Sequence, residues 1–280
     1  MTTKDNQKDK VAVVTGGGGV LCGAMAQELA AQGAKVAVLD LKKAAADELA
    51  NQIKQAGGTA IGVEANVLDR DSLNAAHEEV LSQFGKCDLL VNGAGGNHPK
   101  GTTSKEFFMK EHMAQDGLTT FFDLDPKGVE FVFNLNFLGT LIPTQVFAED
   151  MIGKKNCAIV NISSMNAFTP LTKIPAYSGA KAAVSNFTQW LAVHFAKEGI
   201  RVNALAPGFF LTEQNRTLLT NEDGSLTTRG QQIIDQTPMG RFGAAEDLLS
   251  TFMWLCDPAS AFVTGVVVPI DGGFSAYSGV

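Results

Sequence analysis

Short apolar runs of strand length alternate with longer amphipathic segments along almost the whole chain. The first runs are VAVVTG at residues 11–16, KVAVLD at 35–40, TAIGVEANV at 59–67 and CDLLVNGAG at 87–95. The segment after each run repeats its apolar residues with helical spacing. Strands and helices that alternate in this way build a parallel sheet covered on both faces, so the pattern predicts an α/β protein.

The second half of the chain continues the pattern. It predicts, in order, a helix near 129–151, a strand at 156–164, a helix at 177–197, a strand at 200–207, a helix near 246–256 and a strand at 265–273. Seven strands in this order predict a Rossmann-type, doubly wound parallel sheet. A length of 280 residues with 45% hydrophobic content suits one core, which predicts a single catalytic domain over residues 1–280.

Three segments interrupt the alternation. Residues 1–10 are polar and predict a frayed tail, whereas 96–126 and 209–238 are long connections that follow strands. Both connections are interpreted as substrate loops, because ligands of such sheets bind where the strands end. The first is expected to be ordered, because it holds four aromatic rings that would need burial: Phe107, Phe108, Phe121 and Phe122.

Composition argues against several classes of function. The net charge of −7 comes from 22 basic and 29 acidic residues without a long run of either sign, so no nucleic-acid partner is expected. No apolar run long enough to span a bilayer is evident, and the N-terminus lacks the apolar core of a secretory signal, so a cytoplasmic protein is expected. The four cysteines lack metal or redox spacing, which predicts reduced core residues and no metal site.

A glycine-rich turn joins the first predicted strand to the first predicted helix. In VAVVTGGGGVLCG, glycine lets the backbone approach a ligand closely, and the N–H groups of the turn and of the helix N-terminus face phosphates. The segment predicts a dinucleotide site. A plain strand-to-helix turn is the alternative interpretation.

Asp40 ends the second predicted strand. A carboxylate at this place accepts hydrogen bonds from the adenosine ribose and repels a 2′-phosphate, which predicts NAD(H) as the cofactor. The alternative interpretation is a helix N-cap. Lys42 and Lys43 follow closely, so use of NADP stays open.

Tyr177 and Lys181 are four residues apart in a predicted helix and therefore share one face. A free tyrosine titrates near pH 10, and a neighbouring ammonium is expected to lower the pKa of the phenol into the working range of a proton donor. Ser164 ends the preceding strand, 13 residues before Tyr177. Ser163 ranks lower, because neighbouring strand residues point to opposite faces. The Tyr–Lys pair by itself would also suit a solvated helix face.

These motifs together resemble the short-chain dehydrogenase/reductase superfamily. The turn is similar to its TGxxxGxG fingerprint, with Thr15 and Gly16 in place, but Val20 and Cys22 stand at the second and third family glycines. The NGAG segment at 92–95 resembles the family's NNAG motif. Asn66-Val67 stands where the family usually has Asp-Val, and Pro207-Gly208 where the family lines the nicotinamide pocket.

The resemblance implies a set of residues that contact the cofactor. Thr212 would offer its hydroxyl to the carboxamide or a phosphate, whereas ordinary turn chemistry explains Pro207-Gly208 equally well. The implied set is Thr15, Gly16, Gly18, Gly19, Val20, Leu21, Asp40, Asn66, Val67, Asn92, Gly93, Ala94, Gly95, Tyr177, Lys181, Pro207, Gly208, Phe210 and Thr212.

The resemblance also implies a catalytic tetrad of Asn136, Ser164, Tyr177 and Lys181. Ser164 would hold the substrate oxygen, Tyr177 would exchange its proton, and hydride would pass between the carbinol carbon and the nicotinamide. Lys181 would also hold the nicotinamide ribose, and Asn136 would hold a water that connects Lys181 to solvent. A structural cap or kink is the alternative for Asn136.

Four strings resemble the subgroup of D-mannonate oxidoreductases, also called D-fructuronate reductases: GAGGNHPK, SSMNAFTPLTK, APGFFLTEQNR and DGGFSAYSGV. The resemblance implies a sugar acid as the small-molecule substrate, namely the pair D-mannonate and D-fructuronate. The alternatives are a reductase of another aldonate or polyol, such as a gluconate-type substrate, and a catalytically silent NAD-binding sensor. The complete tetrad argues against the sensor.

A sugar acid needs a cation or N–H donors for its carboxylate and polar partners for its hydroxyls. Each candidate alone is more simply an exposed loop residue, but together they lie on loops that converge at the strand ends. The predicted substrate-binding residues are His98, Ser164, Asn166, Lys173, Tyr177, Gln214, Asn215 and Arg216.

A homo-oligomer, specifically a tetramer, is also expected. Members of the family commonly pair the long helices that correspond here to 129–151 and 177–197. The second of these carries more apolar positions, among them Phe187 and Trp190, than one face against a sheet requires. Ordinary core packing is the alternative.

Overall fold

The structure is a computed structural model that describes residues 6–212 and 215–279. Its sheet has seven parallel strands in the order β3-β2-β1-β4-β5-β6-β7, which confirms the predicted fold class. The strands are β1 (Val11–Thr15), β2 (Lys35–Asp40), β3 (Thr59–Glu64), β4 (Leu89–Asn92), β5 (Ala158–Ile162), β6 (Arg201–Pro207) and β7 (Val267–Ile270).

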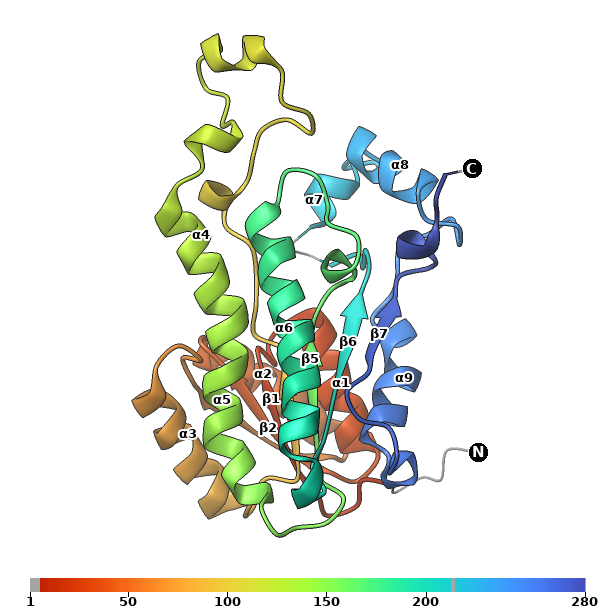
Figure 1. Ribbon diagram of the computed structural model, residues 1–280. Coiled ribbons are helices and arrows are strands. Elements are labelled where there is room, and N and C mark those ends of the chain that lie inside the picture. Colours follow the sequence, from red (N-terminus) through yellow and green to blue (C-terminus); the bar gives the residue numbers. More distant parts are fainter. Residues whose placement is uncertain (1–5, 213–214, 280) are drawn as a thin grey trace.

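Helices cover both faces of the sheet (Figure 1). The helices are α1 (Val20–Ala31), α2 (Lys43–Gln55), α3 (Arg70–Gln83), α4 (Pro126–Phe133), α5 (Gly139–Phe147), α6 (Pro175–His194), α7 (Arg216–Leu219), α8 (Thr228–Asp235) and α9 (Glu246–Cys256). One apolar cluster joins α1, α2 and α9 to the sheet, and another joins α3, α5 and α6 to the opposite face.

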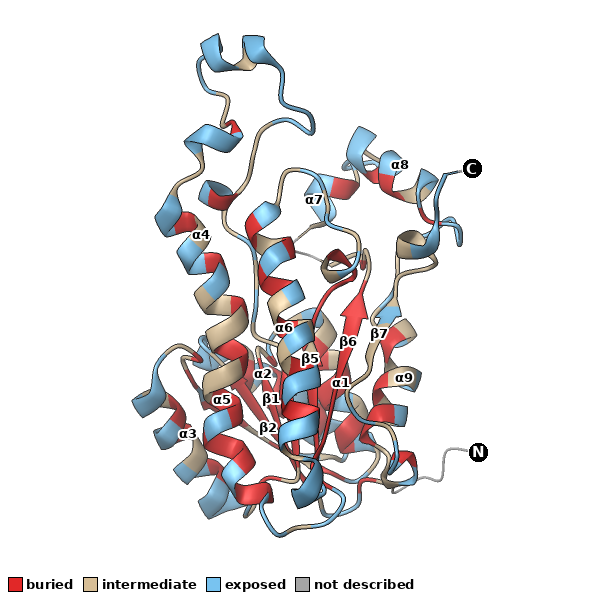
Figure 2. Ribbon diagram, in the orientation of Figure 1, coloured by how far each residue is buried: buried red, intermediate tan, exposed pale blue. Residues whose placement is uncertain are grey.

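Buried strands explain why the sheet forms where it does. In β1, Ala12 and Val14 belong to the cluster of α1, whereas Val11 and Val13 belong to the cluster of α5. This alternation follows from the two-residue period of a strand. Because both faces are covered, the central strands read as continuous apolar runs, and Figure 2 shows β5 and β6 buried almost throughout, whereas β7 at the edge of the sheet is partly exposed.

The strand order reverses between β1 and β4. From β1 the chain moves outward to β2 and β3, and then returns to β4 on the other side of β1. In open parallel sheets, the crevice at such a reversal, outside the carboxyl ends of the strands, is where ligands bind. The glycine-rich turn after β1 and the 92–95 segment after β4 border this crevice.

A continuous helical run crosses the face of the sheet that α3, α5 and α6 cover. It comprises α4, a π-turn at Asn134–Leu138, α5 and a 3-10 turn at Ala148–Met151. Among the described residues, this run of Pro126–Met151 is the one long and apolar enough to cross a membrane, with a mean hydropathy of 1.3. The prediction that no run reaches this length is therefore wrong, but 50% of the apolar window is buried inside the fold, as in a core helix.

The 96–126 connection forms an arm that extends beyond the carboxyl end of the sheet (Figure 1). It contains 3-10 turns at Pro99–Gly101, Lys110–Ala114 and Phe121–Asp123. The prediction that its aromatic rings are buried is wrong, because Phe107 is 75% and Phe122 is 69% exposed. Out there the rings have no core to reach, and Phe108 and Phe121 pack edge-on against Phe122 instead.

Two further segments are more ordered than the sequence suggested. The 209–238 connection contains α7 and α8, joined through an antiparallel bridge between Thr220 and Leu226. In the predicted tail, Gln7 is fully buried, and its side-chain amide donates to the Cys256 carbonyl at 3.3 Å. The tail from residue 6 onward therefore packs on the end of α9 rather than fraying.

A chain of buried polar side chains lies between the sheet and the helices α5 and α6. The Asn92 amide nitrogen donates to Asn161 Oδ1 at 2.8 Å and to Thr144 Oγ1 at 2.9 Å. The Asn161 amide nitrogen donates in turn to Thr188 Oγ1 at 2.9 Å. These bonds tie β4 and β5 to α5 and α6, the helices that flank the catalytic candidates.

Replacing Asn161 with alanine is expected to lower the free energy of unfolding by about 2 kcal/mol. The substitution removes the partner of the Asn92 amide and of the Thr188 hydroxyl, and buried polar groups without partners are costly. Urea unfolding measures the loss. Asn51→Ala, at an exposed position of α2, is the matched control and should stay within about 0.5 kcal/mol of the native protein. Equal effects of the two substitutions would contradict the role of the buried chain.

Candidate active site

The turn after β1 approaches the 92–95 segment so closely that side chains would not fit. Gly16 has φ +64°, and a Cβ there would lie 2.9 Å from the backbone nitrogen of Ala94. A Cβ on Gly17 would lie 2.7 Å from the Val38 side chain. Glycine is therefore required at both positions, and Gly17 is a member of the turn that the sequence analysis did not select.

The turn delivers the N-terminus of α1 without a side-chain cap. Gly19 is the N-cap residue and supplies no side-chain acceptor. Val20 and Leu21 begin the helix, so their N–H groups belong to the set that has no partner within a helix. An uncapped helix N-terminus behind a glycine turn is suited to binding an anion such as a pyrophosphate.

Thr15 holds the turn rather than facing outward. Its side chain is fully buried, and Oγ1 accepts hydrogen bonds from the N–H groups of Gly93 at 3.1 Å and Ala94 at 3.3 Å. The same hydroxyl donates to the Val91 carbonyl at 3.4 Å. The Thr15 hydroxyl thus joins the ends of β1 and β4, and the predicted cofactor contact of Thr15 stays a prediction.

Asp40 lies at the carboxyl end of β2, beside the turn. Its carboxylate accepts hydrogen bonds from the backbone N–H groups of Gly18 at 3.1 Å and Lys42 at 3.0 Å. A Cβ on Gly18 would lie 3.0 Å from the same carboxylate. The acid is therefore oriented by the backbone, but it does not cap α2, whose N-cap residue is Lys42, so the N-cap alternative is wrong.

Ser164 and Ser163 point to different places, as strand alternation predicted. Ser164 follows β5 and is 7% exposed, and its hydroxyl shares a hydrogen bond with Tyr177. The Ser163 hydroxyl instead lies 2.6 Å from Ser185 Oγ and donates to the Lys181 carbonyl at 3.1 Å. The structure thus brings Ser164, not Ser163, to Tyr177.

Lys181 lies one helical turn after Tyr177 on α6, with its Nζ 5.7 Å from the centre of the Tyr177 ring. The ammonium donates to the Ile162 carbonyl at 2.8 Å, a backbone partner that no sequence motif marks. Burial lowers the pKa of Lys181 to about 8. Tyr177 and Lys181 therefore lie on one face of α6, with Ser164 beside Tyr177.

The effect of Lys181 on the tyrosine is not the expected one. Burial raises the pKa of Tyr177 above its ordinary value, and the hydrogen bond with Ser164 is the influence that lowers it. The predicted lowering by Lys181 is therefore wrong for the protein by itself. Desolvation is the main cause of both pKa shifts: it raises the pKa of the Tyr177 phenol and lowers the pKa of the Lys181 ammonium.

Asn136 is fully buried inside the π-turn. Its amide nitrogen donates to the carbonyls of Val132 and Gly96, each at 2.7 Å, and its Oδ1 accepts from the Gly96 N–H at 3.2 Å. A Cβ on Gly95 would lie 2.6 Å from Oδ1 and 3.1 Å from the Lys181 ammonium. Asn136 therefore fixes the segment after β4 directly beside Lys181.

Other predicted cofactor contacts occupy the interior. The Asn92 side chain is 1% exposed and is turned into the buried polar chain, and Phe210 is 5% exposed in the cluster of α9. The cofactor contacts predicted for these two residues stay predictions. Val67 is buried against Gly139. The Asn66 side-chain oxygen accepts from the Leu68 N–H at 3.0 Å, which leaves its amide nitrogen for a ligand.

The Pro207-Gly208 pair continues the pairing of β6 with β7 rather than forming a turn. The Gly208 N–H donates to the Ile270 carbonyl at 2.9 Å, and a Cβ there would lie 2.6 Å from the Asp271 backbone. Beyond it, Asn215 bonds to the backbone of Thr212 and of Phe210 through its two side-chain ends. Asn215 therefore shapes the loop, and its predicted substrate role stays a prediction.

The remaining substrate candidates lie on several loops around Tyr177. His98 caps a 3-10 turn by accepting from the Lys100 N–H, and its ring packs on Phe131. Asn166 is 6% exposed, and its Oδ1 is buried without a partner in the described part of the chain. Arg216 begins α7, whereas Gln214 and its neighbour Glu213 lie outside the described residues.

Lys173 lies on the connection between Ser164 and Tyr177. Its backbone is left-handed, with φ +72°, which is uncommon for a residue other than glycine. Its carbonyl accepts a hydrogen bond from the Thr103 N–H at 2.8 Å, so the arm holds the connection in this conformation. Within the described residues, no three histidine, cysteine or acidic side chains gather as metal ligands. All four cysteines are buried and free, as predicted.

The family model described as short chain dehydrogenase matches residues 10–223 of this chain. The protein belongs to the short-chain dehydrogenase family. An uncharacterised oxidoreductase of Haemophilus influenzae is 56% identical over 276 residues, covering 98% of this chain and 96% of the relative. The uncharacterised oxidoreductase UxuB of Bacillus subtilis is 53% identical over 277 residues, covering 99% and 98%.

A solved structure from Haemophilus influenza, provisionally named a D-mannonate oxidoreductase and holding bound NAD, is also similar. It superimposes with a TM-score of 0.93 at 56% identity, covering 98% of this chain and 97% of that one. The predicted family resemblance is therefore confirmed. The protein is an oxidoreductase of the short-chain dehydrogenase type, in agreement with the Ser164, Tyr177 and Lys181 arrangement.

The two departures from the family fingerprint have different surroundings. Val20 is the first residue of α1, and its side chain is 46% exposed. Cys22 is 5% exposed and lies against Gly93. Neither closes the space in front of the turn that the glycines leave open.

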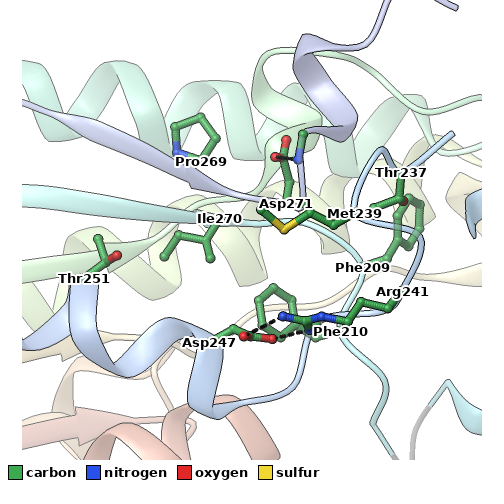
Figure 3. A pocket seen from close by; sticks show the side chains of 13 residues that line it. Phe209, Phe210, Thr237, Met239, Arg241, Asp247, Thr251, Pro269, Ile270 and Asp271 are labelled. Carbon is green, nitrogen blue, oxygen red and sulfur yellow. Dashed lines mark hydrogen bonds and ion pairs between the residues drawn. The ribbon is translucent and has the colours of Figure 1, made fainter.

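A cavity that no member of the predicted tetrad lines lies beside β6 and β7 (Figure 3). It measures about 410 Å³ and lies between the loops after β6 and β7 and the start of α9, with Arg241, Asp247 and Asp271 among its lining residues. Arg241 pairs with Asp247, and the Asp271 carboxylate accepts from the N–H groups of Gly273 and Ser275. Its charged groups thus already have partners, and no member of the predicted tetrad lines it.

Lys181→Met is expected to raise the free energy of unfolding at pH 7 by about 2 kcal/mol. Burial lowers the pKa of Lys181 from 10.5 to about 8, so the charged ammonium opposes folding, and methionine lacks that charge. Between pH 8 and 10.5 the unfolded native chain binds more protons than the folded one. Native stability therefore rises through this range, and the advantage of the variant shrinks.

Urea unfolding of both proteins at pH 7 and pH 10 measures this difference. Lys54→Met, at an exposed position of α2, is the matched control, and its stability difference from the native protein should be the same at both pH values. A stability difference for Lys181→Met that is the same at both pH values would contradict the assignment.

Proposed function

We propose that the protein is an NAD(H)-dependent oxidoreductase that interconverts the secondary alcohol and the ketone of a sugar acid, with D-mannonate and D-fructuronate as its substrate pair. The observation that carries the proposal is the convergence of Ser164, Tyr177 and the buried Lys181 on one space beside the glycine turn. We propose that the whole chain is one catalytic domain, with 96–126 and 209–238 as its substrate loops.

The residues around the turn suit NAD. The uncapped N-terminus of α1 would hold the pyrophosphate, and the glycines leave the room that a Cβ would fill. Asp40 is oriented by two backbone N–H groups and would accept from the adenosine ribose. When bound, the nicotinamide accepts or donates the hydride. The NAD in the similar Haemophilus structure supports this choice.

Asp40→Ser is expected to shift the ratio of kcat/KM for NADPH over NADH by about 100-fold toward NADPH, equivalent to about 2.7 kcal/mol. The carboxylate repels a 2′-phosphate, whereas serine is neutral and still accepts a hydrogen bond. Steady-state kinetics with the two cofactors measure the ratio. Glu64→Gln removes a negative charge at the end of the neighbouring strand β3 and should leave the ratio unchanged. A similar shift in both variants would indicate a general field effect and refute the assignment.

Ser164 and Tyr177 would act on the substrate oxygen together. In the reductive direction, the Tyr177 hydroxyl donates its proton to the carbonyl oxygen as that oxygen becomes an alcohol, while the Ser164 hydroxyl donates a hydrogen bond to it. The raised pKa of Tyr177 keeps the phenol protonated before the reaction, as a proton donor must be. The Lys181 ammonium then stabilises the phenolate that remains. Asn136 fixes the adjoining backbone.

Lys173 and Asn166 are our candidates for recognising the sugar acid. Lys173 supplies a cation on the connection that joins Ser164 to Tyr177, where a substrate carboxylate would come near it. The buried Asn166 Oδ1 needs a donor, which a sugar hydroxyl would supply after a small local movement. His98 and Arg216, on the two long loops, would complete the polar surroundings.

The exposed face of α6 suggests how the protein assembles. Trp190 and Val193 on α6 are 55% and 79% exposed, and the Trp190 ring stacks on His194 and on Phe187. An apolar helix face of this kind supports pairing with a second copy, so we propose a homo-oligomer, with a tetramer as the expected state. We also propose a cytoplasmic location, in keeping with four cysteines that are all buried and free.

D-fructuronate is expected to drive NADH oxidation by the native protein, and Tyr177→Phe is expected to lower kcat by about 10² to 10⁴-fold. Phenylalanine keeps the ring but lacks the proton, so binding of NADH should stay within about threefold of native. Absorbance at the nicotinamide band follows turnover, and fluorescence titration follows binding. An active Tyr177→Phe enzyme would refute the proton-transfer role.

Two serine variants and a substrate panel complete this experiment. Ser164→Ala should lose most activity, whereas Ser163→Ala should keep it, because the Ser163 hydroxyl faces α6. A panel of epimeric hexuronates and gluconate-type acids tests the substrate. If D-fructuronate is inert and another acid reacts, the substrate assignment fails while the oxidoreductase chemistry stands.

A further inference from the structure

Cys22 and Gly93 share one small space beneath the proposed cofactor site. A Cβ built on Gly93 would lie 2.1 Å from the Cys22 sulfur and 2.9 Å from the Thr15 carbonyl oxygen. Both distances are shorter than real Cβ contacts, so any side chain at position 93 would force its neighbours apart. The sulfur therefore occupies the volume that a side chain at position 93 would need.

Neither partner has room to withdraw. Cys22 is the third residue of α1, is 5% exposed and belongs to the core cluster of that helix. The Gly93 N–H donates to Thr15 Oγ1 at 3.1 Å, and the Ala94 N–H donates to the same hydroxyl at 3.3 Å. The contact between Cys22 and Gly93 thus sets the separation between α1 and the 93–95 segment.

That segment borders the proposed catalytic lysine. The backbone of Ala94 lies so close to Gly16 that a Cβ on Gly16 would be 2.9 Å from it. A Cβ on Gly95 would lie 3.1 Å from the Lys181 ammonium. A displacement of residues 93–95 would therefore change both the glycine turn and the surroundings of Lys181.

We infer that Cys22 and Gly93 form a complementary pair of positioning residues, in which the thiol fills the space over Gly93 and fixes the 93–95 segment for cofactor binding. The inference rests on the proposed NAD(H) site. Burial raises the pKa of Cys22 to about 12, so the group is a neutral thiol that acts by its volume. Two departures from the family motifs, cysteine for glycine at 22 and glycine for asparagine at 93, thereby have one explanation.

A double-mutant cycle with Cys22→Ala and Gly93→Ala tests the pair. Gly93→Ala should weaken NADH binding by about tenfold, because its methyl group collides with the sulfur. Cys22→Ala leaves only Cβ, which lies 3.5 Å from the Cβ position on Gly93, so the double variant relieves this collision. We expect the double variant to bind NADH about fivefold more tightly than Gly93→Ala. It should remain weaker than native, because the Thr15 carbonyl contact persists.

The readouts are the Kd of NADH by fluorescence titration and the Tm of the protein without cofactor. Gly101→Ala is the matched control, because a Cβ there meets nothing nearer than 3.4 Å, and it should keep the native Kd. If Gly93→Ala lowers Tm but leaves the Kd unchanged, the pair has only a packing role and the positioning role is rejected. If the double variant binds no better than Gly93→Ala, the pair is also rejected.

Two further outcomes are decisive. If Gly93→Ala fails to fold while the double variant folds and binds NADH, the complementarity is supported; if neither folds, it is rejected. A native protein that binds no NADH would overturn the proposed function itself, and this inference with it. If the native protein binds NADH but the double-mutant cycle shows no coupling between positions 22 and 93, only the role of Cys22 and Gly93 is overturned.

Discussion

The contact between the turn after β1 and the segment after β4 determines the geometry of the whole site. Thr15 Oγ1 accepts hydrogen bonds from two consecutive backbone N–H groups, those of Gly93 and Ala94. It thereby joins the turn after β1 to the segment after β4 at the centre of the sheet. Such close backbone packing requires glycine at Gly16, whose φ is positive. The helix N-terminus on one side and the catalytic candidates on the other are both positioned by this junction.

Burial explains the chemistry of the catalytic candidates better than their mutual attraction does. The pKa of Lys181 is lowered and that of Tyr177 is raised, and desolvation is the first cause in each case. Both shifts favour the neutral form. In the protein without substrate, Lys181 therefore loses its proton more easily than a free lysine, and Tyr177 keeps its proton more firmly than a free tyrosine. A polar substrate oxygen that enters this space finds a proton donor already prepared.

The sequence predicted the fold and the catalytic residues well because both follow from local patterns. The alternating apolar runs required a covered parallel sheet, and the helical spacing placed Tyr177 and Lys181 on one face, as the structure has them. Strand alternation separated Ser164 from Ser163 correctly. Failures occurred where tertiary contacts decide. Nothing local indicated that the Asn92 side chain would turn into a buried polar chain.

The arm shows the same limit from the opposite side. Aromatic residues usually indicate burial, but Phe107 and Phe122 extend past the edge of the sheet where no core is available. Only the three-dimensional path of the chain shows this. The backbone contact between Thr103 and Lys173 is likewise invisible in the sequence, since neither side chain takes part.

The π-turn at Asn134–Leu138 gives the long helical run a property that a regular helix lacks. One added residue in a regular helix rotates everything beyond it by about 100° and would turn an apolar stripe away from its sheet. Here the wider turn takes up the extra residue, so Val132 before it is buried against α6 and Phe147 after it is buried against the sheet. The irregularity thus lets one helix serve two registers, one for the sheet below and one for the amide of Asn136 at the site.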